Sequence, residues 1–271
     1  MGFAPPPKGI RYPGGTRSVC VISIDFDHLT KSKRSDQNRW YPEPRKDLLA
    51  RNALGTRDMI AVSEKHSIPM TWAICGETAE ADRASYERIL RSKVKQEIGV
   101  HTYSHVDVSS CNERELTEEV AKCLGVLNLN ERPKTFIFPW NREGNFEVLK
   151  KLGFETYRDP KRSVRSPFEN HNLVDLAPTY YVDQKSMGAS GLMKKYLELC
   201  ISWNSVFHLW LHPWSVVLEG DERGAFVSQT LDPLFAFMRK KRDEGVLSVC
   251  TMGELSTFHR QEQVKQSELA V

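Results

Sequence analysis

The sequence lacks a long apolar run, a dense block of like charge and a paired-cysteine motif. No apolar stretch reaches the roughly 18 residues that a membrane-spanning helix needs, so we expect no membrane span. The formal net charge is only +3, and basic residues are interleaved with acidic ones, so nucleic acid is not an expected partner. The six cysteines are scattered without C-x-x-C spacing, which predicts free thiols rather than a cysteine-ligated metal.

Two further absences bear on location and on domain organisation. Residues 1–18 carry a triple proline and a double glycine but no apolar core, so they do not resemble a signal peptide, and we expect a cytoplasmic protein. No linker rich in Gly, Ser or Pro interrupts the body of the chain. The 271 residues therefore predict an N-terminal arm over 1–18, one domain over 19–260 and a polar tail over 261–271.

Apolar, β-branched segments alternate with amphipathic or charged segments along the chain. Strands are expected over 19–24, 69–74, 97–100, 134–138, 154–158, 173–176, 206–211 and 246–249. Helices are expected between them, over 44–66, 82–95, 113–127, 147–152, 188–203, 232–242 and 252–260. This alternation predicts an α/β fold with parallel strands, either a βα-repeat barrel or a doubly wound sheet. The polar segment 28–44 is interpreted as a long loop that faces a substrate.

The most informative stretch is residues 101–105, which read His-Thr-Tyr-Ser-His. If this stretch makes one helical turn, its two imidazoles point the same way. Neutral imidazole is the commonest protein ligand for a divalent transition metal. His101 also follows an expected strand, and α/β folds build their sites where strands end. The alternative is a pair of ordinary surface or core histidines.

Asp25 and Asp27 end the first expected strand, where side chains two residues apart share a face. Asp27, His101 and His105 would form a metal site of two histidines and one carboxylate, with positions open for water and substrate. Asp25 would act as the general base, and His212, at the end of another strand, as the acid for a departing amine. The alternative for the aspartates is a helix cap or a turn.

These motifs, in their order along the chain, resemble the polysaccharide deacetylases, which are carbohydrate esterase family 4 or the NodB homology domain. Residues 23–27 (SIDFD) resemble the first family motif, with one extra residue between the aspartates. Residues 101–105 match the second motif, His-Ser/Thr-x-x-His, in full. Residues 136–141 (FIFPWN) are similar to the third motif, and residues 211–212 resemble the fifth.

The resemblance implies a distorted (β/α) barrel of about seven parallel strands and a metal-dependent hydrolase that removes acetyl from an N-acetylated sugar or glycan. It implies that Asp25 is the base and His212 the acid. It also implies that Asp27, His101 and His105 hold one divalent metal, with zinc favoured over cobalt, nickel or iron. The oligomeric state stays open, and a homo-oligomer is compatible with the sequence.

Two departures from the family pattern need an explanation. The third-motif arginine, which orients the base in the family, is Ile137 here, and we hypothesise that Arg142 replaces it. The fourth motif is unclear, and Asp175 is a weak candidate for it. Trp140 and Trp214 flank the expected site and, with Arg142, are the candidate substrate-binding residues. A backbone N–H near Trp140 would help the metal to bind the oxyanion.

Three functions remain open at this point. The leading one is carbohydrate N-deacetylation, with a nucleotide- or lipid-linked N-acetyl sugar as the substrate that suits a cytoplasmic enzyme. The second is hydrolysis of another non-peptide C–N bond on the same fold. The third is a non-catalytic glycan-binding barrel, which would be favoured if Asp25 turned away from the metal residues or if His212 lay far from them. His208, inside an apolar run, is interpreted as a core histidine.

Overall fold

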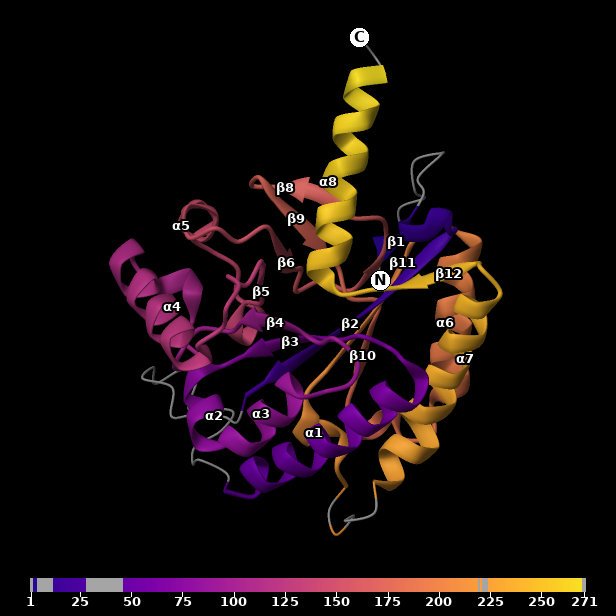
Figure 1. The fold of residues 1–271 in the computed structure, drawn as a ribbon, viewed down its shortest axis with the longest axis horizontal. Helices are drawn as coiled ribbons and strands as arrows, with labels where there is room; N and C mark the ends of the chain where they lie inside the picture. Colours follow the sequence, from indigo (N-terminus) through magenta and orange to yellow (C-terminus); the bar gives the residue numbers. More distant parts are fainter. Residues whose placement is uncertain (1, 4–11, 28–45, 219, 221–223, 270–271) are drawn as a thin grey trace.

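The computed structural model describes residues 2–3, 12–27, 46–218, 220 and 224–269. Among these residues, one large sheet carries ten strands, in the order β10-β11-β2-β3-β4-β5-β6-β9-β8, with β12 also paired to β2. The pairs along the sheet are parallel except β8–β9, which is antiparallel. The sheet curls into a half-barrel, which confirms the expected α/β fold (Figure 1).

Most strands of the large sheet are short, and β2 is the longest of them. Those of the large sheet are β2 (Ser18–Phe26), β3 (Thr71–Ile74), β4 (Glu97–Val100), β5 (Thr135–Phe136), β6 (Thr156–Arg158), β8 (Phe168–Asn170), β9 (Leu173–Leu176), β10 (Tyr180–Val182), β11 (Val206–Leu211) and β12 (Leu247–Val249). A separate parallel pair joins β1 (Gly2–Phe3) to β7 (Ser163–Val164).

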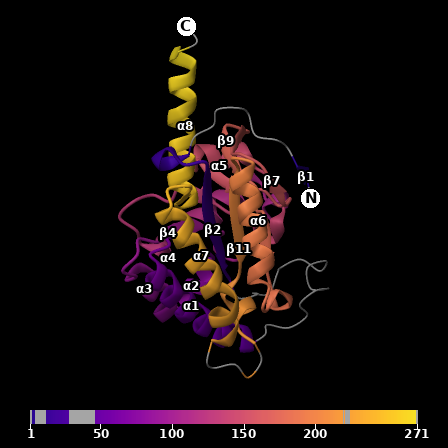
Figure 2. The ribbon, with the colours of Figure 1, turned by 90° about the vertical axis from the view of Figure 1, so that its right-hand side faces the viewer.

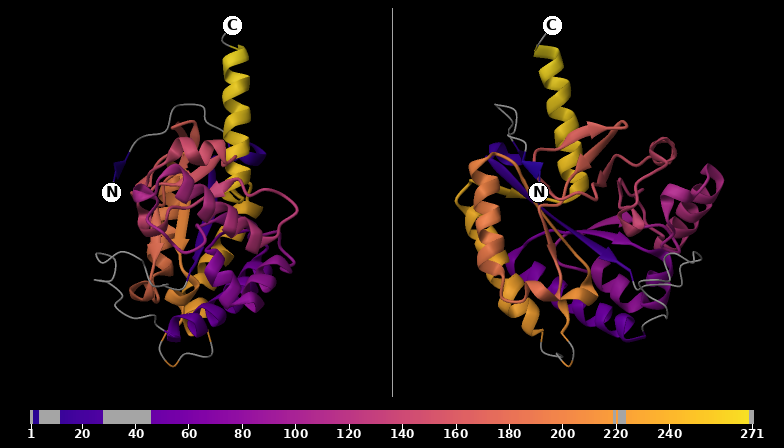
Figure 3. Two further views of the ribbon diagram at one scale, coloured as in Figure 1. Left: turned by 90° about the vertical axis from the view of Figure 1, so that its left-hand side faces the viewer. Right: turned by 180° about the vertical axis from the view of Figure 1, so that it is seen from behind.

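Most helices cover the outer face of the curled sheet, and the start of the last helix packs on its inner face. The α-helices are α1 (Lys46–His66), α2 (Gly76–Ala81), α3 (Arg83–Leu90), α4 (Glu113–Leu127), α5 (Phe146–Lys151), α6 (Ser190–Ser202), α7 (Asp232–Asp243) and α8 (Met252–Leu269). Helices α6 and α7 lie side by side next to β2 and β11 (Figure 2). The far end of α8 projects away from the body of the molecule (Figure 3).

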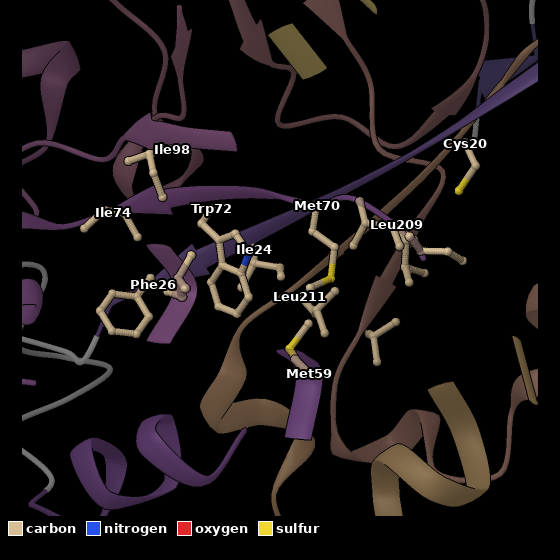
Figure 4. Packing of buried hydrophobic residues seen from close by; sticks show 14 of the residues in the cluster. Cys20, Ile24, Phe26, Met59, Met70, Trp72, Ile74, Ile98, Leu209 and Leu211 are labelled. Carbon is tan, nitrogen blue, oxygen red and sulfur yellow. The ribbon is translucent and has the colours of Figure 1, made fainter. Parts of the chain in front are cut away.

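The outer face of the sheet is apolar because every second strand residue packs against the helices. On β2 these residues are Cys20, Ile22, Ile24 and Phe26, all fully buried (Figure 4). The helices contribute apolar residues to the same buried cluster, such as Met59 of α1. Burial of this kind contributes about 1.5–3 kcal/mol for each large side chain, and it fixes which residues are left to face the other side.

The inner face of the half-barrel changes from apolar to polar along the strands. Val19 and Val21 of β2 lie in a second buried cluster, which the start of α8 covers through Met252. Further along the same face come Ser23 and then Asp25 of β2. The carboxyl end of the sheet is therefore where buried polar groups gather, as the alternation of strand side chains requires.

Several details differ from the sequence-based expectations. Among the described residues, nine strands of the large sheet pair in parallel, against the expected number of about seven, and among them only the short β10 was not an expected strand. The tail after residue 260 is not a separate segment, because α8 runs on to Leu269. The expected substrate-facing loop, residues 28–44, lies outside the described residues, as do residues 1 and 4–11 of the expected N-terminal arm. Among the described helices, none has the length and apolarity to cross a membrane.

Candidate metal and catalytic site

Asp25 and Asp27 lie at the carboxyl end of β2 and point to the inner face of the half-barrel. Each is about 2% exposed, so neither is a surface carboxylate. Their neighbours on both sides are parallel strands, β11 and β3, whose carboxyl ends reach the same level. An unpaired carboxylate at such a position would lose several kcal/mol of hydration, so each must have partners.

The histidine loop, residues 101–105, follows β4 but does not form the helical turn that the spacing suggested. Thr102 and His105 adopt left-handed backbone angles, with φ of 58° and 55°. Backbone N–H groups of Gly76 and Glu77, at the start of α2, donate to the carbonyls of Thr102 and Tyr103 at 3.1 and 2.9 Å. The two imidazoles meet because the loop is folded back on itself, and no helix is involved.

Glu119 of α4 holds the other side of this loop. Its carboxylate accepts hydrogen bonds from the backbone N–H groups of Tyr103 and Ser104, at 3.1 and 2.8 Å. It also accepts the hydroxyl of Ser104 at 2.8 Å. Hydrogen bonds to a charged acceptor are stronger than neutral ones, so Glu119 offsets the strain of the left-handed residues.

Asp27, His101 and His105 form the one cluster among the described residues that could hold a metal ion. One ligand atom from each lies within 4.8 Å of the others, and all three residues are buried. Oδ2 of Asp27 is 3.2 Å from Nε2 of His105 and 3.5 Å from Nε2 of His101. The sequence therefore predicted a juxtaposition that the fold produces, from segments more than 70 residues apart in the chain.

The hydrogen bonding of His101 shows why these residues fit a metal. Its Nδ1 lies 2.7 Å from the carbonyl oxygen of Ile137, which can only accept, so Nδ1 carries the proton. In a neutral ring, Nε2 then presents a lone pair toward the Asp27 carboxylate, and two acceptors face each other. A cation between them removes this conflict. A backbone carbonyl on the second nitrogen is also the usual way to orient a metal-binding histidine.

Asp25 has a different partner. Arg158, at the end of β6, donates from both terminal nitrogens to the two carboxylate oxygens of Asp25, each at 2.6 Å. The arginine side chain is fully buried, and its guanidinium lies 4.2 Å from the ring centre of Trp210. Nε1 of Trp210 donates to Oδ2 of Asp25 at 3.0 Å. Burial alone would raise the pKa of Asp25, but the charge and hydrogen bonds of Arg158 lower it below its ordinary value.

The arginine on the proposed base is therefore Arg158 rather than the Arg142 of our hypothesis. Arg142 donates instead to Asp107 at 2.6 Å, and its side chain is 45% exposed. The third-motif position, Ile137, contributes its backbone carbonyl to His101 and its side chain to the inner apolar cluster. The arginine that binds Asp25 thus comes from β6, the strand next to β5 in the sheet.

His212 completes the group from the end of β11. Its Nε2 lies 3.7 Å from Oδ2 of Asp25 and 3.7 Å from Oδ2 of Asp27. Burial lowers its pKa, although the two aspartates oppose this shift. Its buried Nδ1 has no hydrogen-bond partner among the described residues. Asp175, the weak fourth-motif candidate, is bound to Tyr157 and Arg165, and burial raises its pKa to about 6.

The two tryptophans predicted to contact substrate both lie at this site. Trp140 has a left-handed φ of 60°, and its ring packs edge-on against His105 at 4.7 Å between centroids. Its indole N–H donates to the backbone carbonyl of His105 at 3.0 Å. The indole N–H of Trp214 donates to Oδ1 of Asp27 at 3.1 Å, and its ring lies 4.6 Å from that of His212. Both rings therefore position site residues, while their contact with substrate stays a prediction.

Sequence reasoning missed Arg158, Trp210 and the hydrogen bonds behind them. His208, taken as a core histidine, is fully buried and binds the Ser23 hydroxyl at 2.8 Å. Ser23 in turn accepts from Arg158 at 3.2 Å. One signal was available: Arg158 ends its strand just as Asp25 and His212 lie at the ends of theirs. Its pairing with Asp25 could not be inferred without the strand order.

Known proteins are similar to this chain in part of its sequence and in its fold. The family model for polysaccharide deacetylase matches residues 52–157, a range that contains the histidine loop. No curated protein sequence gives a significant match. A polysaccharide deacetylase structure from Mycobacterium smegmatis superposes with a TM-score of 0.75 at 16% identity, covering 95% of each chain. The resemblance stated from the sequence motifs is thereby confirmed.

Two further solved structures share the fold. One, described as a polysaccharide deacetylase from Pseudomonas aeruginosa PAO1, has a TM-score of 0.68 at 12% identity and covers 92% of this chain and 93% of its own. The other is Puue allantoinase, with a TM-score of 0.67 at 13% identity and 91% coverage of both chains. At these identities the likeness concerns the fold, and the chemistry must be argued from the site residues.

Proposed function

Because this chain resembles the polysaccharide deacetylases in sequence over residues 52–157 and in fold over nearly its whole length, we propose that it is a metal-dependent hydrolase that removes acetyl from an N-acetylated sugar or glycan. The observation that carries the proposal is the meeting of three groups at one end of the sheet. These are the metal-binding set around Asp27, the arginine-bound Asp25 and His212, whose Nε2 is 3.7 Å from both aspartates.

Asp27, His101 and His105 would hold the metal, and zinc suits a site of two histidines and one carboxylate. A bound divalent ion would polarise the acetyl carbonyl and lower the pKa of an attacking water. Oδ2 of Asp25 accepts two hydrogen bonds, one from Arg158 and one from Trp210. Oδ1 accepts only the hydrogen bond from Arg158 among these two residues. Oδ1 of Asp25 would therefore take the water proton.

Amide hydrolysis also requires a proton for the departing amine. His212 would supply it from Nε2, the nitrogen that faces the aspartates. The oxyanion would be stabilised beside the left-handed turn at Trp140, where we place a backbone N–H as donor. The positions of Asp25 and His212 argue against a non-catalytic glycan-binding barrel, because neither residue is turned away from the metal-binding set.

Hydrolysis of another non-peptide C–N bond is the second candidate. It is favoured by the departure from the family motif, in which Arg158 of β6 rather than a third-motif residue binds the base. The structural likeness to Puue allantoinase shows that this fold is also used by a protein whose name is not that of a sugar deacetylase. The same base, acid and metal-binding residues would serve in the hydrolysis of an N-acetyl sugar or of another C–N bond.

The decisive experiment measures metal content and acetate release together. We expect about one metal per chain in the wild type, and loss of both metal and acetate release from N-acetylated oligosaccharides in the His101→Ala/His105→Ala double variant. His259→Ala, a histidine on α8 far along the chain from the site, serves as the matched control and should retain both.

Other results would redirect the proposal. Bound metal with no acetate from any N-acetylated sugar, but ammonia or amine release from another amide, would favour the second candidate. Absence of metal in the wild type, even after zinc, cobalt or nickel is supplied, would refute the metal-dependent mechanism.

A further inference from the structure

A cleft of about 650 Å³ opens at the edge of the sheet formed by β10 and β11. We call it the edge cleft, and the residues that matter here are Tyr181, Tyr196, Trp210, Arg162 and Lys185. Neither the sequence motifs nor the family comparisons assign a role to these residues. The cleft is polar as well as aromatic, so it differs from the apolar interior on either side of the sheet.

The edge cleft begins at the candidate catalytic residues. Trp210 belongs to its wall and also donates to the carboxylate of Asp25 at 3.0 Å. The ring of Tyr181 lies 4.3 Å from that of Trp210 and 6.0 Å, edge-on, from that of His212. If the acetamide of a substrate lies between Asp25 and His212, the part of the substrate next to the acetamide would therefore lie in the edge cleft.

Aromatic rings give this cleft a surface suited to sugars. Tyr181 and Trp210 are both half-buried. The guanidinium of Arg158 lies 4.2 Å from the ring centre of Trp210 and the ring of Tyr181 lies 4.3 Å from it, so Trp210 meets the cleft with a ring edge. Tyr196 of α6 adds a further ring, which packs at 5.7 Å against Tyr180. The C–H face of a pyranose packs well on such rings, while the tyrosine hydroxyls can bind sugar hydroxyls.

Two cations make the cleft selective. Arg162 and Lys185 are exposed on its wall, and neither side chain has an acidic partner in the described part of the chain. One carboxylate, Asp183, also lines the cleft, but its Oδ1 accepts the backbone N–H of Lys185 at 3.0 Å and the Ser186 hydroxyl at 3.4 Å. Two positive charges against one committed carboxylate leave the wall with a net charge of +1, which favours an anionic ligand.

We propose that the edge cleft binds an anionic substituent of the substrate, a phosphate or a carboxylate carried next to the N-acetylated sugar. This inference rests on the proposed deacetylase function, because it takes Asp25 and His212 as the place of reaction. Tyr181 and Trp210 support the sugar ring, and Arg162 and Lys185 pair with the anion. The substrate class is thus an acidic N-acetyl sugar rather than a neutral oligomer such as chitobiose.

The test compares neutral and anionic sugars on two charge-matched double variants. Arg162→Gln/Lys185→Gln removes the cations of the edge cleft. Arg88→Gln/Lys93→Gln removes one arginine and one lysine that are exposed ahead of β4, at the opposite end of the strands. Binding of N-acetylglucosamine, N-acetylglucosamine 1-phosphate and N-acetylmuramic acid is measured by calorimetry at low and high salt, and acetate release from each is assayed in parallel.

We expect at least one anionic sugar to bind the wild type more tightly than N-acetylglucosamine. That preference should fall about five- to tenfold in Arg162→Gln/Lys185→Gln, stay in the control variant and shrink at high salt, since exposed charge pairs are weak and screened. The two anionic sugars distinguish a phosphate from a carboxylate as the group recognised. In turnover, KM for the anionic substrate should rise while kcat is unchanged, because the cations lie away from Asp25.

Equal affinity for neutral and anionic sugars, no binding of either anionic sugar, or a preference unchanged in Arg162→Gln/Lys185→Gln would overturn the assignment of the edge cleft. Acetate release without any charge preference would do so while leaving the deacetylase intact. A salt-sensitive preference that depends on Arg162 and Lys185, without acetate release from any sugar, would instead support the cleft as an anion site and refute the proposed reaction.

Discussion

Asp25, near the end of β2, and Asp27, the residue after β2 ends, lie two positions apart, yet their surroundings differ in kind. Asp25 shares both oxygens with the guanidinium of Arg158. Asp27 faces imidazole nitrogens, at 3.2 Å from His105 and 3.5 Å from His101. Each also accepts one indole N–H, from Trp210 for Asp25 and from Trp214 for Asp27.

This difference bears on the roles proposed for the two aspartates. Arginine side chains stay charged in proteins, so the guanidinium bound to Asp25 compensates the charge of this carboxylate and holds it in one orientation. The histidines around Asp27 can be neutral, and then only a cation compensates its charge. This contrast supports the roles proposed above, with Asp25 as the base and Asp27 as a metal ligand. Three predictions test this contrast, beginning with the largest expected effect, and a fourth concerns Asp175.

Removing the arginine should affect the Asp25 side alone. In Arg158→Met, Asp25 is left buried without its cation, which should lower the free energy of unfolding by about 3–5 kcal/mol. Acetate release should fall about 100-fold or more, because the base loses its orientation. Metal content should stay near that of the wild type, because Arg158 contacts none of the three metal-binding residues in the described structure.

Arg142→Met and Arg114→Met provide controls for this prediction. Arg114 is 81% exposed and 3.9 Å from Glu118, so its loss should change stability by less than about 1 kcal/mol. Arg142→Met should reduce acetate release far less than Arg158→Met. If the Arg142 change removed turnover and the Arg158 change did not, Arg142 would be the arginine that serves the base after all. Thermal unfolding and metal analysis are run on all variants.

Releasing the histidine loop should affect the Asp27 side alone. Glu119→Gln replaces a charged acceptor of two backbone N–H groups and one hydroxyl, so the loop should hold His101 and His105 less firmly. We expect metal affinity to fall about 10- to 100-fold, the usual size for a residue that supports metal ligands. Titration of the metal-free protein with zinc against a competing chelator measures this. Glu118→Gln, on the exposed side of the same helix, should leave the affinity unchanged, and equal behaviour of the two variants would contradict the role of Glu119.

Replacing each of the two tryptophans by phenylalanine should affect one aspartate at a time. Trp214→Phe removes the donor on Asp27 and should weaken metal binding about tenfold, given the strength of a hydrogen bond to a charged group. Trp210→Phe removes the donor on Asp25 and should lower turnover by a similar factor with metal affinity unchanged. Zinc titration and acetate release on both variants give a double comparison. Were both variants to lose metal equally, the two aspartates would act as one unit.

Asp175 is a third buried aspartate, and it behaves in the opposite way. Its pKa is raised to about 6 by burial, against the opposing effects of Arg165 and Tyr157. A raised folded-state pKa gives stability that is full below the unfolded value and is lost as pH rises through about 6. Relative to Asp175→Asn, the wild type should therefore gain about 1 kcal/mol between pH 7 and pH 5. Chemical denaturation of both proteins at pH 7 and pH 5 measures this gain. If the free energy of unfolding of the wild type relative to Asp175→Asn did not rise from pH 7 to pH 5, the raised pKa of Asp175 would be contradicted.

Local sequence was sufficient for most elements. The strands β4, β9 and β11 and the helix α4 have the bounds expected from apolar runs and from the capping residue Asn112. Those bounds were predictable because side-chain periodicity and capping are local properties. The short strands β8 and β10 were missed, since three residues are too few to establish an alternation.

The contacts of the site were predictable only in part. The ordered motifs predicted that Asp27, His101 and His105 would meet, and they do. The same motifs led to Arg142 as the predicted partner of the base, because it is the first arginine after Ile137 in the sequence. Arg158 is instead delivered by β6, which lies beside β5 in the sheet and brings a side chain from outside the third motif.

The sequence by itself determined the strand alternation, the residue types at the strand ends and the His-x-x-x-His spacing, because each depends on neighbours within a few positions. Only the tertiary structure decided that Asp25 pairs with Arg158 and that Asp27 lies against His101 and His105. It also decided that the histidine loop is bent by Thr102 and His105 and braced by Glu119. Buried charges find partners across the sheet, and which partner is nearest depends on strand order and curvature, which no short stretch of chain encodes.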